Sequence, residues 1–219
     1  MEQQRGKYIV IEGHDGTGKS TQIRTLSEQL QEQGKATLII EEPGSDDPAR
    51  SLAVANRIRS VIKDGSLQKD GITNLLLFTA ARHELLKQRI EPALKLGTYV
   101  LSARNWLSTL AYQGYGEGLD LELIESTTRE FTSDLYMQPD ATIMLLMEDE
   151  AERQQRIAKR GALQETPDTF ESRNDDFQRR VQQGYSHIAK QYELLVVSAN
   201  QSIKDVAREV MALLEGDVL

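Results

Sequence analysis

Residues 13–20 read G-H-D-G-T-G-K-S and fit the pattern G-x-x-x-x-G-K-[S/T]. A short apolar run at residues 8–11 precedes the pattern, and residues 21–33 follow it with apolar side chains at helical spacing. Strand, glycine-rich loop and helix in this order are the setting of a phosphate-binding loop (P-loop), because the glycines let backbone N–H groups turn toward phosphate oxygens at the start of the helix. The pattern therefore predicts a unit that binds a nucleoside triphosphate.

The residue types of the P-loop have separate expected tasks. Lys19 should reach the terminal phosphates, and the Ser20 hydroxyl should hold a Mg²⁺ ion. Asp15 is unusual here because a carboxylate repels phosphate, so we expect it to serve a second ligand or to be only a turn residue. The loop residues that would make up the ATP site are Gly13, Asp15, Gly16, Thr17, Gly18, Lys19, Ser20 and Thr21.

Short apolar runs alternate with amphipathic segments along the chain. The runs that predict buried strands are residues 8–11, 36–40, 98–101, 141–147 and 194–197. The segments that predict helices are residues 21–33, 50–63, 72–96, 121–131, 150–160, 175–194 and 202–214. Pro92 is expected to kink or break the third of these. The alternation predicts a three-layer α/β fold, a five-stranded parallel sheet with helices on both faces, in a single domain over residues 1–219.

Composition excludes several classes of protein. The net charge is −8, which argues against a non-specific nucleic-acid binder. The chain has no cysteine, so it has no disulfide, thiolate metal site or cysteine nucleophile. Its first residues lack an apolar core and no apolar run approaches the length of a membrane span, so we expect a cytoplasmic protein that does not contact membranes.

Ligands of parallel sheets bind at the carboxyl ends of the strands, and the loops expected there carry unusual sequence. The longest expected loop, residues 102–118, contains R-N-W-L-S-T-L-A-Y-Q-G from Arg104 onward. It resembles the thymidylate kinase segment D-R-x-x-x-S-T-x-A-Y-Q-G. Residues 42–44 (E-P-G), 77–82 (L-F-T-A-A-R) and 177–185 (F-Q-R-R-V-Q-Q-G-Y) are similar to that family's E-P-G, L-F-x-A-x-R and F-x-x-R-V-x-x-G-Y patterns. By this resemblance the chain is identified as a divergent member of the thymidylate kinase family of P-loop nucleoside monophosphate kinases.

The resemblance implies transfer of the γ-phosphoryl group of ATP to thymidine 5′-monophosphate (dTMP), with Mg²⁺ as cofactor. Phe78 would stack on the thymine ring, and Arg82, one helical turn further on, would reach the base or its phosphate. Arg104 would clamp the acceptor phosphate, a task that suits a planar bidentate donor. The other implied acceptor contacts are Asp15 at the sugar 3′-hydroxyl, Tyr112 at the sugar, and Thr109 and Gln113 at the polar edge of the base.

The resemblance also implies a short lid near residues 161–175. The family has a similar R-x-x-x-R-G spacing, which falls on Arg156 and Arg160 here. A lid of this kind closes over the triphosphate, so Arg156 is expected to bind ATP. Asn200 and Gln201, after the last expected strand, would lie near the adenine.

Two further expectations concern the metal and the partner. Glu42 would hold the Mg²⁺ ion through water, together with Ser20, or would orient Arg104, and the sequence leaves both open. The family is typically a homodimer joined through helices that flank the sheet. Residues 50–63 and 72–86 could supply such a face, so the expected partners are ATP, dTMP and a second copy of the chain.

Three positions depart from the family's patterns. The D-R pair of the family is A-R here, at Ala103, and its R-E-P-G turn begins with Glu41. The arginine of the lid pattern D-R-x-E is replaced by Thr169. Some members carry a catalytic arginine in the P-loop instead, but that position is Gly16. Neither usual source of the catalytic arginine is therefore present.

We expect catalysis to rest on Lys19 and Arg104, with Arg160 or Arg173 supplying the missing positive charge in the transition state. Two alternatives stay open. The chain could be a kinase for another, 5-substituted pyrimidine deoxynucleoside monophosphate, or a nucleotide-binding regulatory protein on a weakened kinase fold. A P-loop GTPase is disfavoured because no N-K-x-D guanine signature follows the later strands.

Overall fold

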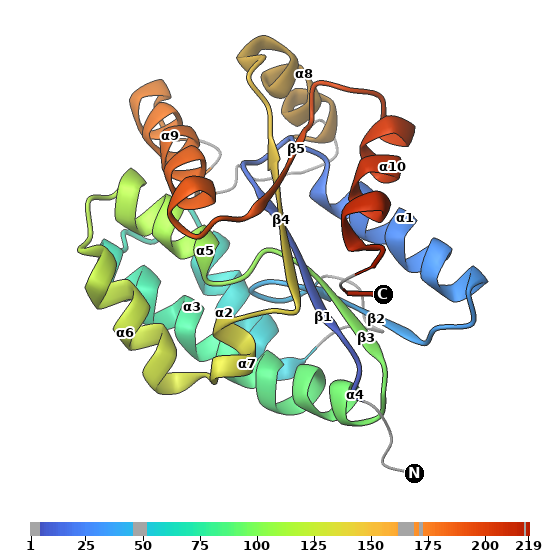
Figure 1. The fold of residues 1–219 in the computed structure, drawn as a ribbon. Helices are drawn as coiled ribbons and strands as arrows, with labels where there is room; N and C mark the ends of the chain where they lie inside the picture. Colours follow the sequence, from blue (N-terminus) through green and yellow to red (C-terminus); the bar gives the residue numbers. More distant parts are fainter. Residues whose placement is uncertain (1–4, 46–51, 162–168, 171–172, 217) are drawn as a thin grey trace.

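Five parallel strands form one sheet in the order β2-β3-β1-β4-β5 (Figure 1). The structure, a computed structural model, describes residues 5–45, 52–161, 169–170, 173–216 and 218–219, and the side chain of Arg160 lies outside this description. The strands are β1 (Tyr8–Gly13), β2 (Thr37–Glu41), β3 (Tyr99–Ala103), β4 (Ala141–Leu146) and β5 (Leu195–Ser198). Each predicted strand is found with its ends within two residues, which confirms the predicted parallel α/β fold.

Helices cover both faces of the sheet (Figure 1). Helices α1 (Lys19–Glu32) and α10 (Ile203–Leu214) lie on one face, where they pack over Ile9 and Ile11 of β1. The alternate side chains Tyr8 and Val10 enter a second core on the other face. Strand residues alternate between two buried faces in this way only when both faces are covered, which is the reason that β1 is apolar throughout.

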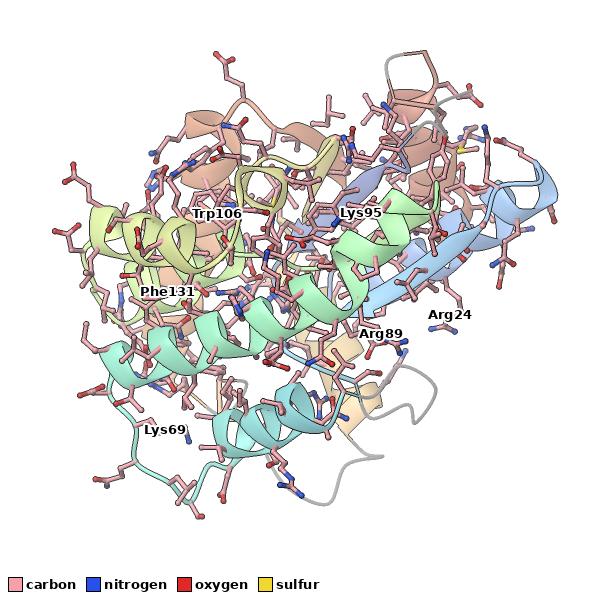
Figure 2. The ribbon with its side chains drawn as sticks, turned by 90° about the horizontal axis from the view of Figure 1, so that it is seen from below. Arg24, Lys69, Arg89, Lys95, Trp106 and Phe131 are labelled. Atoms are coloured by element: carbon pink, nitrogen blue, oxygen red, sulfur yellow. The ribbon has the colours of Figure 1, made fainter. Side chains whose placement is uncertain are left out.

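Each predicted helical segment contains a helix. The helices not yet given are α2 (Ala53–Lys63), α3 (Gly71–Leu85), α4 (Glu91–Lys95), α6 (Leu121–Phe131), α7 (Asp134–Met137), α8 (Glu150–Gly161) and α9 (Asp175–Gln191). Helices α3 and α4 form one continuous rod, which Figure 2 shows from below. A π-helical turn, η1 (Leu86–Ile90), joins them just before Pro92. A wider turn suits this place because proline cannot donate to the carbonyl one turn back and its ring crowds that carbonyl.

The expected loop at residues 102–118 is largely helical, and this part of the prediction was wrong. It contains a short helix, α5 (Leu107–Thr109), followed by a π-helical segment, η2 (Leu110–Gly116). Most of its side chains are buried, so the sequence has no alternation of apolar and polar residues that would predict a helix. Helix α7 was not predicted either. Within the described part of the chain, no helix has the length and apolar character needed to cross a membrane.

Candidate active site

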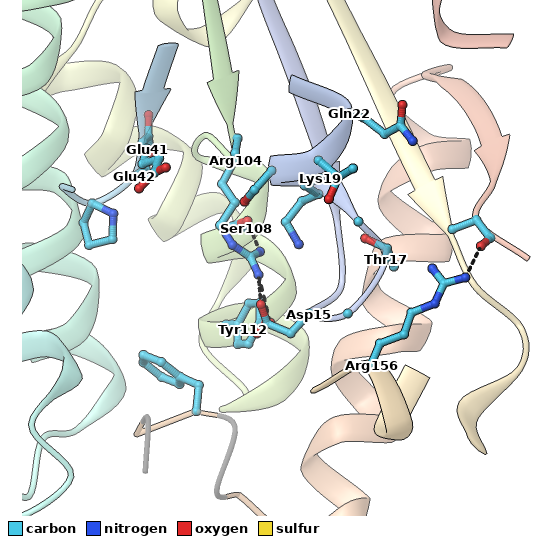
Figure 3. A pocket seen from close by; sticks show the side chains of 18 of the residues that line it. Asp15, Thr17, Lys19, Gln22, Glu41, Glu42, Arg104, Ser108, Tyr112 and Arg156 are labelled. Carbon is cyan, nitrogen blue, oxygen red and sulfur yellow. Dashed lines mark hydrogen bonds and ion pairs between the residues drawn. The ribbon is translucent and has the colours of Figure 1, made fainter. Parts of the chain in front are cut away.

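A cavity of about 870 Å³ opens at the carboxyl ends of the strands, where ligands of parallel sheets bind (Figure 3). Its walls come from the P-loop, the end of β2, helix α3, the segment after β3, helix α8 and the loop after β5. The predicted site residues that line it are Asp15, Gly16, Thr17, Gly18, Lys19, Ser20, Thr21, Glu42, Phe78, Arg82, Arg104, Thr109, Tyr112, Gln113, Arg156 and Gln201. The fold thus brings most predicted residues of both ligand sites into a single space.

The P-loop is held in its turn by contacts to one carbonyl. The carbonyl oxygen of His14 accepts hydrogen bonds from Lys19 Nζ and Thr17 Oγ1, each at 2.9 Å. Gly18, just before helix α1, has a φ of 93°, a conformation that favours glycine. The Lys19 amine therefore lies across the loop, where the phosphates of a triphosphate would be cradled.

Gly16 is required by packing as well as by backbone conformation. Its φ is 89°, and a Cβ added there would lie 3.0 Å from both the carbonyl oxygen and the Cγ of Arg153. Arg153 is almost fully buried; it donates to the carbonyl of Asp15 (3.0 Å) and makes two bonds to the Glu150 carboxylate (2.6 and 2.8 Å). Helix α8 is thereby fixed against the outside of the P-loop. The sequence did not single out Arg153, because an arginine on a polar helix face carries no signal of burial.

Asp15 and Arg104 form the ionic centre of the cavity. Asp15 accepts from Arg104 Nη2 and from the Tyr112 hydroxyl, each at 2.6 Å (Figure 3). Arg104 also donates to Ser108 Oγ (2.9 Å) and Tyr185 OH (2.7 Å), and its φ of 78° is rare for a residue with a side chain. Burial alone would raise the pKa of Asp15, but the charges of Arg104 and Lys19 and the Tyr112 hydroxyl hold it well below its usual range. Asp15 is therefore a carboxylate whose charge Arg104 balances.

A buried acid, Glu12, joins the P-loop to the segment after β3. It is fully buried at the end of β1, and its carboxylate accepts from the backbone N–H of Asn105 (2.7 Å) and from Ser108 Oγ (2.8 Å). These bonds hold the turn that carries Arg104. Sequence reasoning missed Glu12, although an acidic residue directly after an apolar strand is a signal that could have marked it.

Arg82 and Glu42 form a second ion pair, which is buried. Arg82 Nε donates to Glu42 Oε2 at 2.8 Å, Nη1 donates to Thr109 Oγ1 at 2.7 Å, and both charged side chains are only 1% exposed. The Tyr136 hydroxyl donates to the other oxygen of Glu42. Both carboxylate oxygens of Glu42 are thus engaged, and this acid supports Arg82. Its hydrogen bonds go to Arg82 and Tyr136 rather than to Arg104, and its role at a metal stays a prediction.

An aromatic pocket occupies the side of the cavity next to this ion pair. Phe78 on helix α3 and Tyr112 on η2 line it, and the Phe170 ring packs 6.1 Å from Phe78 and 5.6 Å from Tyr112 between ring centroids. The guanidinium of Arg82 lies 5.3 Å from the Phe78 centroid. The Gln113 amide is fully buried near the Glu117 carboxylate, and among the described residues no group makes a well-formed hydrogen bond to it.

The loop after β5 reaches the opposite side of the cavity. Gln201 lines the cavity, and Arg156 from helix α8 donates to the carbonyl of Ala199 at 3.3 Å. Asn200 is turned away: its Oδ1 accepts from the backbone N–H of Glu148 at 3.2 Å, and it is not among the lining residues. The structure thus brings Arg156 and Gln201 together but leaves Asn200 outside the cavity.

Arg173, one of the two arginines expected to replace the missing catalytic arginine, is not among the described residues that line the cavity. Arg173 is 43% exposed; its guanidinium lies 4.4 Å from the Phe177 ring centroid and 3.4 Å from Glu117 Oε1. The side chain of Arg160 and residues 162–168 of the expected lid lie outside the described residues. The catalytic role of either arginine stays a prediction.

Two departures from the family's patterns lie next to each other in the sheet. Ala103, where the family has aspartate, pairs in register with Glu41, where the family has arginine. Parallel neighbours are about 4.8 Å apart and point to the same side, and both residues line the cavity. The third departure, Thr169, donates to the carbonyls of Ile62 (3.1 Å) and Lys63 (2.8 Å) at the end of helix α2.

Comparisons with known proteins agree on one family. The profile of the thymidylate kinase family matches residues 11–210. The thymidylate kinase of Nitrosospira multiformis is 37% identical over 208 residues, covering 94% of this chain and 95% of its own, and that of Exiguobacterium sibiricum is 35% identical over 208 residues, covering 94% and 92%. A crystal structure of thymidylate kinase from Ehrlichia chaffeensis has a TM-score of 0.72 at 27% identity and covers 96% of this chain and 99% of that one. The chain belongs to the thymidylate kinase family.

Proposed function

We propose that this chain transfers the γ-phosphoryl group of ATP to dTMP to give dTDP. The observation that carries the proposal is the single cavity in which the P-loop lysine and the Arg104–Asp15 centre face an aromatic pocket. Its relatives over nearly their full lengths are named thymidylate kinases. Phosphoryl transfer needs positioning and charge neutralisation rather than covalent help from the protein, and the cavity offers both.

The two halves of the cavity divide the task. On the donor side, P-loop N–H groups and Lys19 neutralise the triphosphate, with Arg156 and Gln201 toward the adenine. On the acceptor side, Arg104 binds the phosphate of dTMP, because a guanidinium already placed by five oxygen acceptors needs little further ordering. Asp15 then holds the acceptor sugar beside the donor phosphates.

Recognition of the base rests on the aromatic pocket and on an unsatisfied amide. Phe78 offers its face to the thymine ring. The buried Gln113 amide offers a donor and an acceptor to the polar edge of the base, and Thr109 lies one turn before it. Such a site rejects ligands that leave its buried polar groups unpaired, so a pyrimidine with matching edge groups is favoured. The same chemistry admits 5-substituted deoxyuridine monophosphates.

The residues present fit a Mg²⁺ ion that is held partly by substrate phosphates. Magnesium favours hydroxyl, carboxylate and phosphate oxygens, and the lining offers the Ser20 hydroxyl and the Glu41 carboxylate. Within the described residues no group of three or more His, Cys, Asp or Glu side chains could hold a metal by itself, so water and phosphate would complete the coordination. When bound, the ion would neutralise charge on the phosphates. We infer that Glu41 supplies the carboxylate that the family carries at position 103.

We also propose that two copies of the chain associate and that the protein acts in the cytoplasm. Helices α2 and α3 pack side by side and expose the apolar side chains Val54 (51%), Val61 (40%), Ile72 (44%) and Leu76 (54%). This surface coincides with the residues expected to face a second copy. A molar mass near that of one chain in light scattering at micromolar concentration would exclude the dimer.

One assay tests the activity. Purified protein is given ATP, Mg²⁺ and dTMP, and ADP release is followed, with the Lys19→Ala variant as the reference. Turnover no faster than that of the variant would overturn the proposed reaction. A panel of pyrimidine monophosphates separates dTMP from 5-substituted substrates. Binding of both nucleotides without turnover would instead select the regulatory protein.

A further inference from the structure

The side chain and the main chain of His14 face different parts of the molecule. Its carbonyl holds Lys19 and Thr17 inside the P-loop, as described above. Its imidazole is 3% exposed, is not part of the cavity lining, and packs with ring centroids 6.1 Å from both Tyr112 and Tyr185. The imidazole therefore has a contact set of its own, which phosphate binding does not explain.

His14 begins a chain of two hydrogen bonds that ends at Phe170. Its Nε2 lies 2.9 Å from Gln178 Oε1 on helix α9, and Gln178 Nε2 donates to the carbonyl of Phe170 at 2.7 Å. The Phe170 carbonyl can only accept, so the NH₂ group of Gln178 must face it and the amide oxygen must face His14. The hydrogen on the imidazole is consequently at Nε2.

The imidazole is neutral in this arrangement. With the hydrogen at Nε2, Nδ1 is a bare acceptor, and it is buried without a hydrogen-bond partner among the described residues. Protonation would place an N–H there with nothing to accept it. Burial, followed by the charge of nearby Arg153, lowers the pKa of His14 to about 4, which agrees with a neutral ring.

Phe170 forms part of the aromatic pocket of the proposed acceptor site. It is 7% exposed, and its ring contacts Phe78 and Tyr112. The hydrogen-bonded chain therefore connects the P-loop, which binds the donor, with a wall of the pocket that receives the acceptor base. Helix α9 carries the connecting side chain, and Gln178 satisfies both ends of its amide in doing so.

We propose that His14 is a positioning residue that acts through Gln178: it fixes the Phe170 backbone and so sets the shape of the acceptor's aromatic pocket. This inference rests on the proposed function for the identity of the acceptor. A histidine that merely filled space would be replaceable by any side chain of similar volume, whereas this role requires a hydrogen at the position of Nε2. A space-filling role and a positioning role predict different effects of substitution on the binding of dTMP and of ATP.

The test compares substitutions that remove the hydrogen bonds while keeping volume. His14→Met and Gln178→Met each break the chain, and His14→Gln retains a donor of similar reach. Gln182→Met is the matched control, because Gln182 lies one turn further along α9 and donates to the Met147 carbonyl instead. The dissociation constants for dTMP and for a non-hydrolysable ATP analogue are measured by calorimetry on the full chain.

We expect His14→Met and Gln178→Met each to weaken dTMP binding about fivefold to tenfold, the effect of one lost buried hydrogen bond. Binding of the ATP analogue should change less than about threefold, since the His14 carbonyl is retained. The double variant should be no weaker than either single variant, because both break one chain. Recovery in His14→Gln and wild-type binding in Gln182→Met support the role. Additive effects, or equal losses for both nucleotides, overturn it.

A second measurement is independent of the acceptor. Nitrogen-15 NMR of the His14 ring at pH 7 should show a neutral imidazole with hydrogen on Nε2, and Gln178→Met should shift that signal. A charged ring, or hydrogen on Nδ1, overturns the chain of hydrogen bonds whatever the substrate is. If wild-type protein does not bind dTMP but shows this tautomer, the proposed substrate fails while the connection from the P-loop to Phe170 stands.

Discussion

The donor loop and the acceptor pocket of this cavity are built in opposite ways. The donor loop consists of consecutive residues, 13–20, and it offers mainly backbone N–H groups. The acceptor pocket consists of side chains from distant segments that are already paired with one another, such as Arg104 with Asp15 and Arg82 with Glu42. A local motif therefore suffices to specify the donor site, whereas the acceptor site exists only when the chain is folded.

The two arginines of the acceptor side differ in their exposure and in how fully their hydrogen-bond donors are used. Both were expected to contact the acceptor. Arg82 is 1% exposed and fully engaged with Glu42, Thr109 and the backbone, whereas the side chains of Arg104 and its partner Asp15 are 17% and 19% exposed. Arg82 is thus placed to support the pocket, and Arg104 is placed to exchange contacts with a ligand.

Removal of Arg82 should have the largest effect on stability. Arg82→Met leaves the Glu42 carboxylate buried without its partner, so we expect the free energy of unfolding to fall by about 3–5 kcal/mol. Urea unfolding measures this, and the double variant Arg82→Met/Glu42→Gln should recover part of the loss. Arg129→Met, which breaks an exposed pair with Glu125, is the control and should cost less than about 1 kcal/mol. A loss no larger than that of the control would show that Arg82 is free to serve the ligand.

Lys19→Ala should have the largest effect on catalysis. The variant removes the side-chain charge nearest the expected phosphates, so we expect kcat to fall by at least about 10²-fold, the usual effect of losing one transition-state donor. Steady-state ADP release measures the change, and circular dichroism checks that the fold is kept. Lys35→Ala, outside the cavity, should leave the rate unchanged. An equal loss in both variants would contradict the role of Lys19.

Arg104→Lys tests whether bidentate geometry matters on the acceptor side. Lysine keeps the charge but not the planar fork, so kcat/KM for dTMP should fall about 10- to 100-fold. The affinity for an ATP analogue should stay within about threefold, because Arg104 contacts the P-loop at the Gly13 carbonyl and the Asp15 carboxylate and not at Lys19, and lysine keeps the positive charge beside Asp15. Equal losses for dTMP and for the ATP analogue would contradict the division of the cavity into a donor half and an acceptor half.

Arg173→Ala should have a smaller effect. If this arginine supplies transition-state charge, kcat falls more than KM does. Its present contacts with Glu117 and Phe177 would have to be exchanged for phosphate during the reaction. Because of that exchange we expect a loss of about tenfold or less, smaller than is typical of a preplaced arginine. An unchanged kcat removes Arg173 from the mechanism.

Glu41→Gln should have the smallest effect. It removes one carboxylate at the edge of the cavity, so the Mg²⁺ concentration for half-maximal rate should rise a few-fold, about as much as for one lost water-mediated ligand. Binding of Mn²⁺ to the complex with an ATP analogue, followed by electron paramagnetic resonance, should weaken in parallel. In Ala103→Asp/Glu41→Gln the carboxylate returns on the neighbouring strand, and Mn²⁺ affinity should recover. Identical affinities in all three proteins would exclude Glu41 from the metal site.

Much of the fold followed from local patterns, and the failures have physical causes. The apolar runs predicted all five strands, because a parallel sheet buried on both faces needs uninterrupted apolar residues. The helical segment at residues 107–116 was missed, because a helix buried on most sides has no polar face to reveal its period. Arg153 and Gln178 were missed because their burial depends on what packs over them.

The sequence by itself determined the P-loop, the order of strands and helices along the chain, and the family. All three depend on consecutive residues and on motif spacing. Only the tertiary structure decided how the charges pair. Glu42 meets Arg82 rather than Arg104, and Asp15 meets Arg104 from 89 residues away. Electrostatic and hydrogen-bond partners are chosen by distance in space and by shared burial, and neither is encoded in the spacing of residues along the chain.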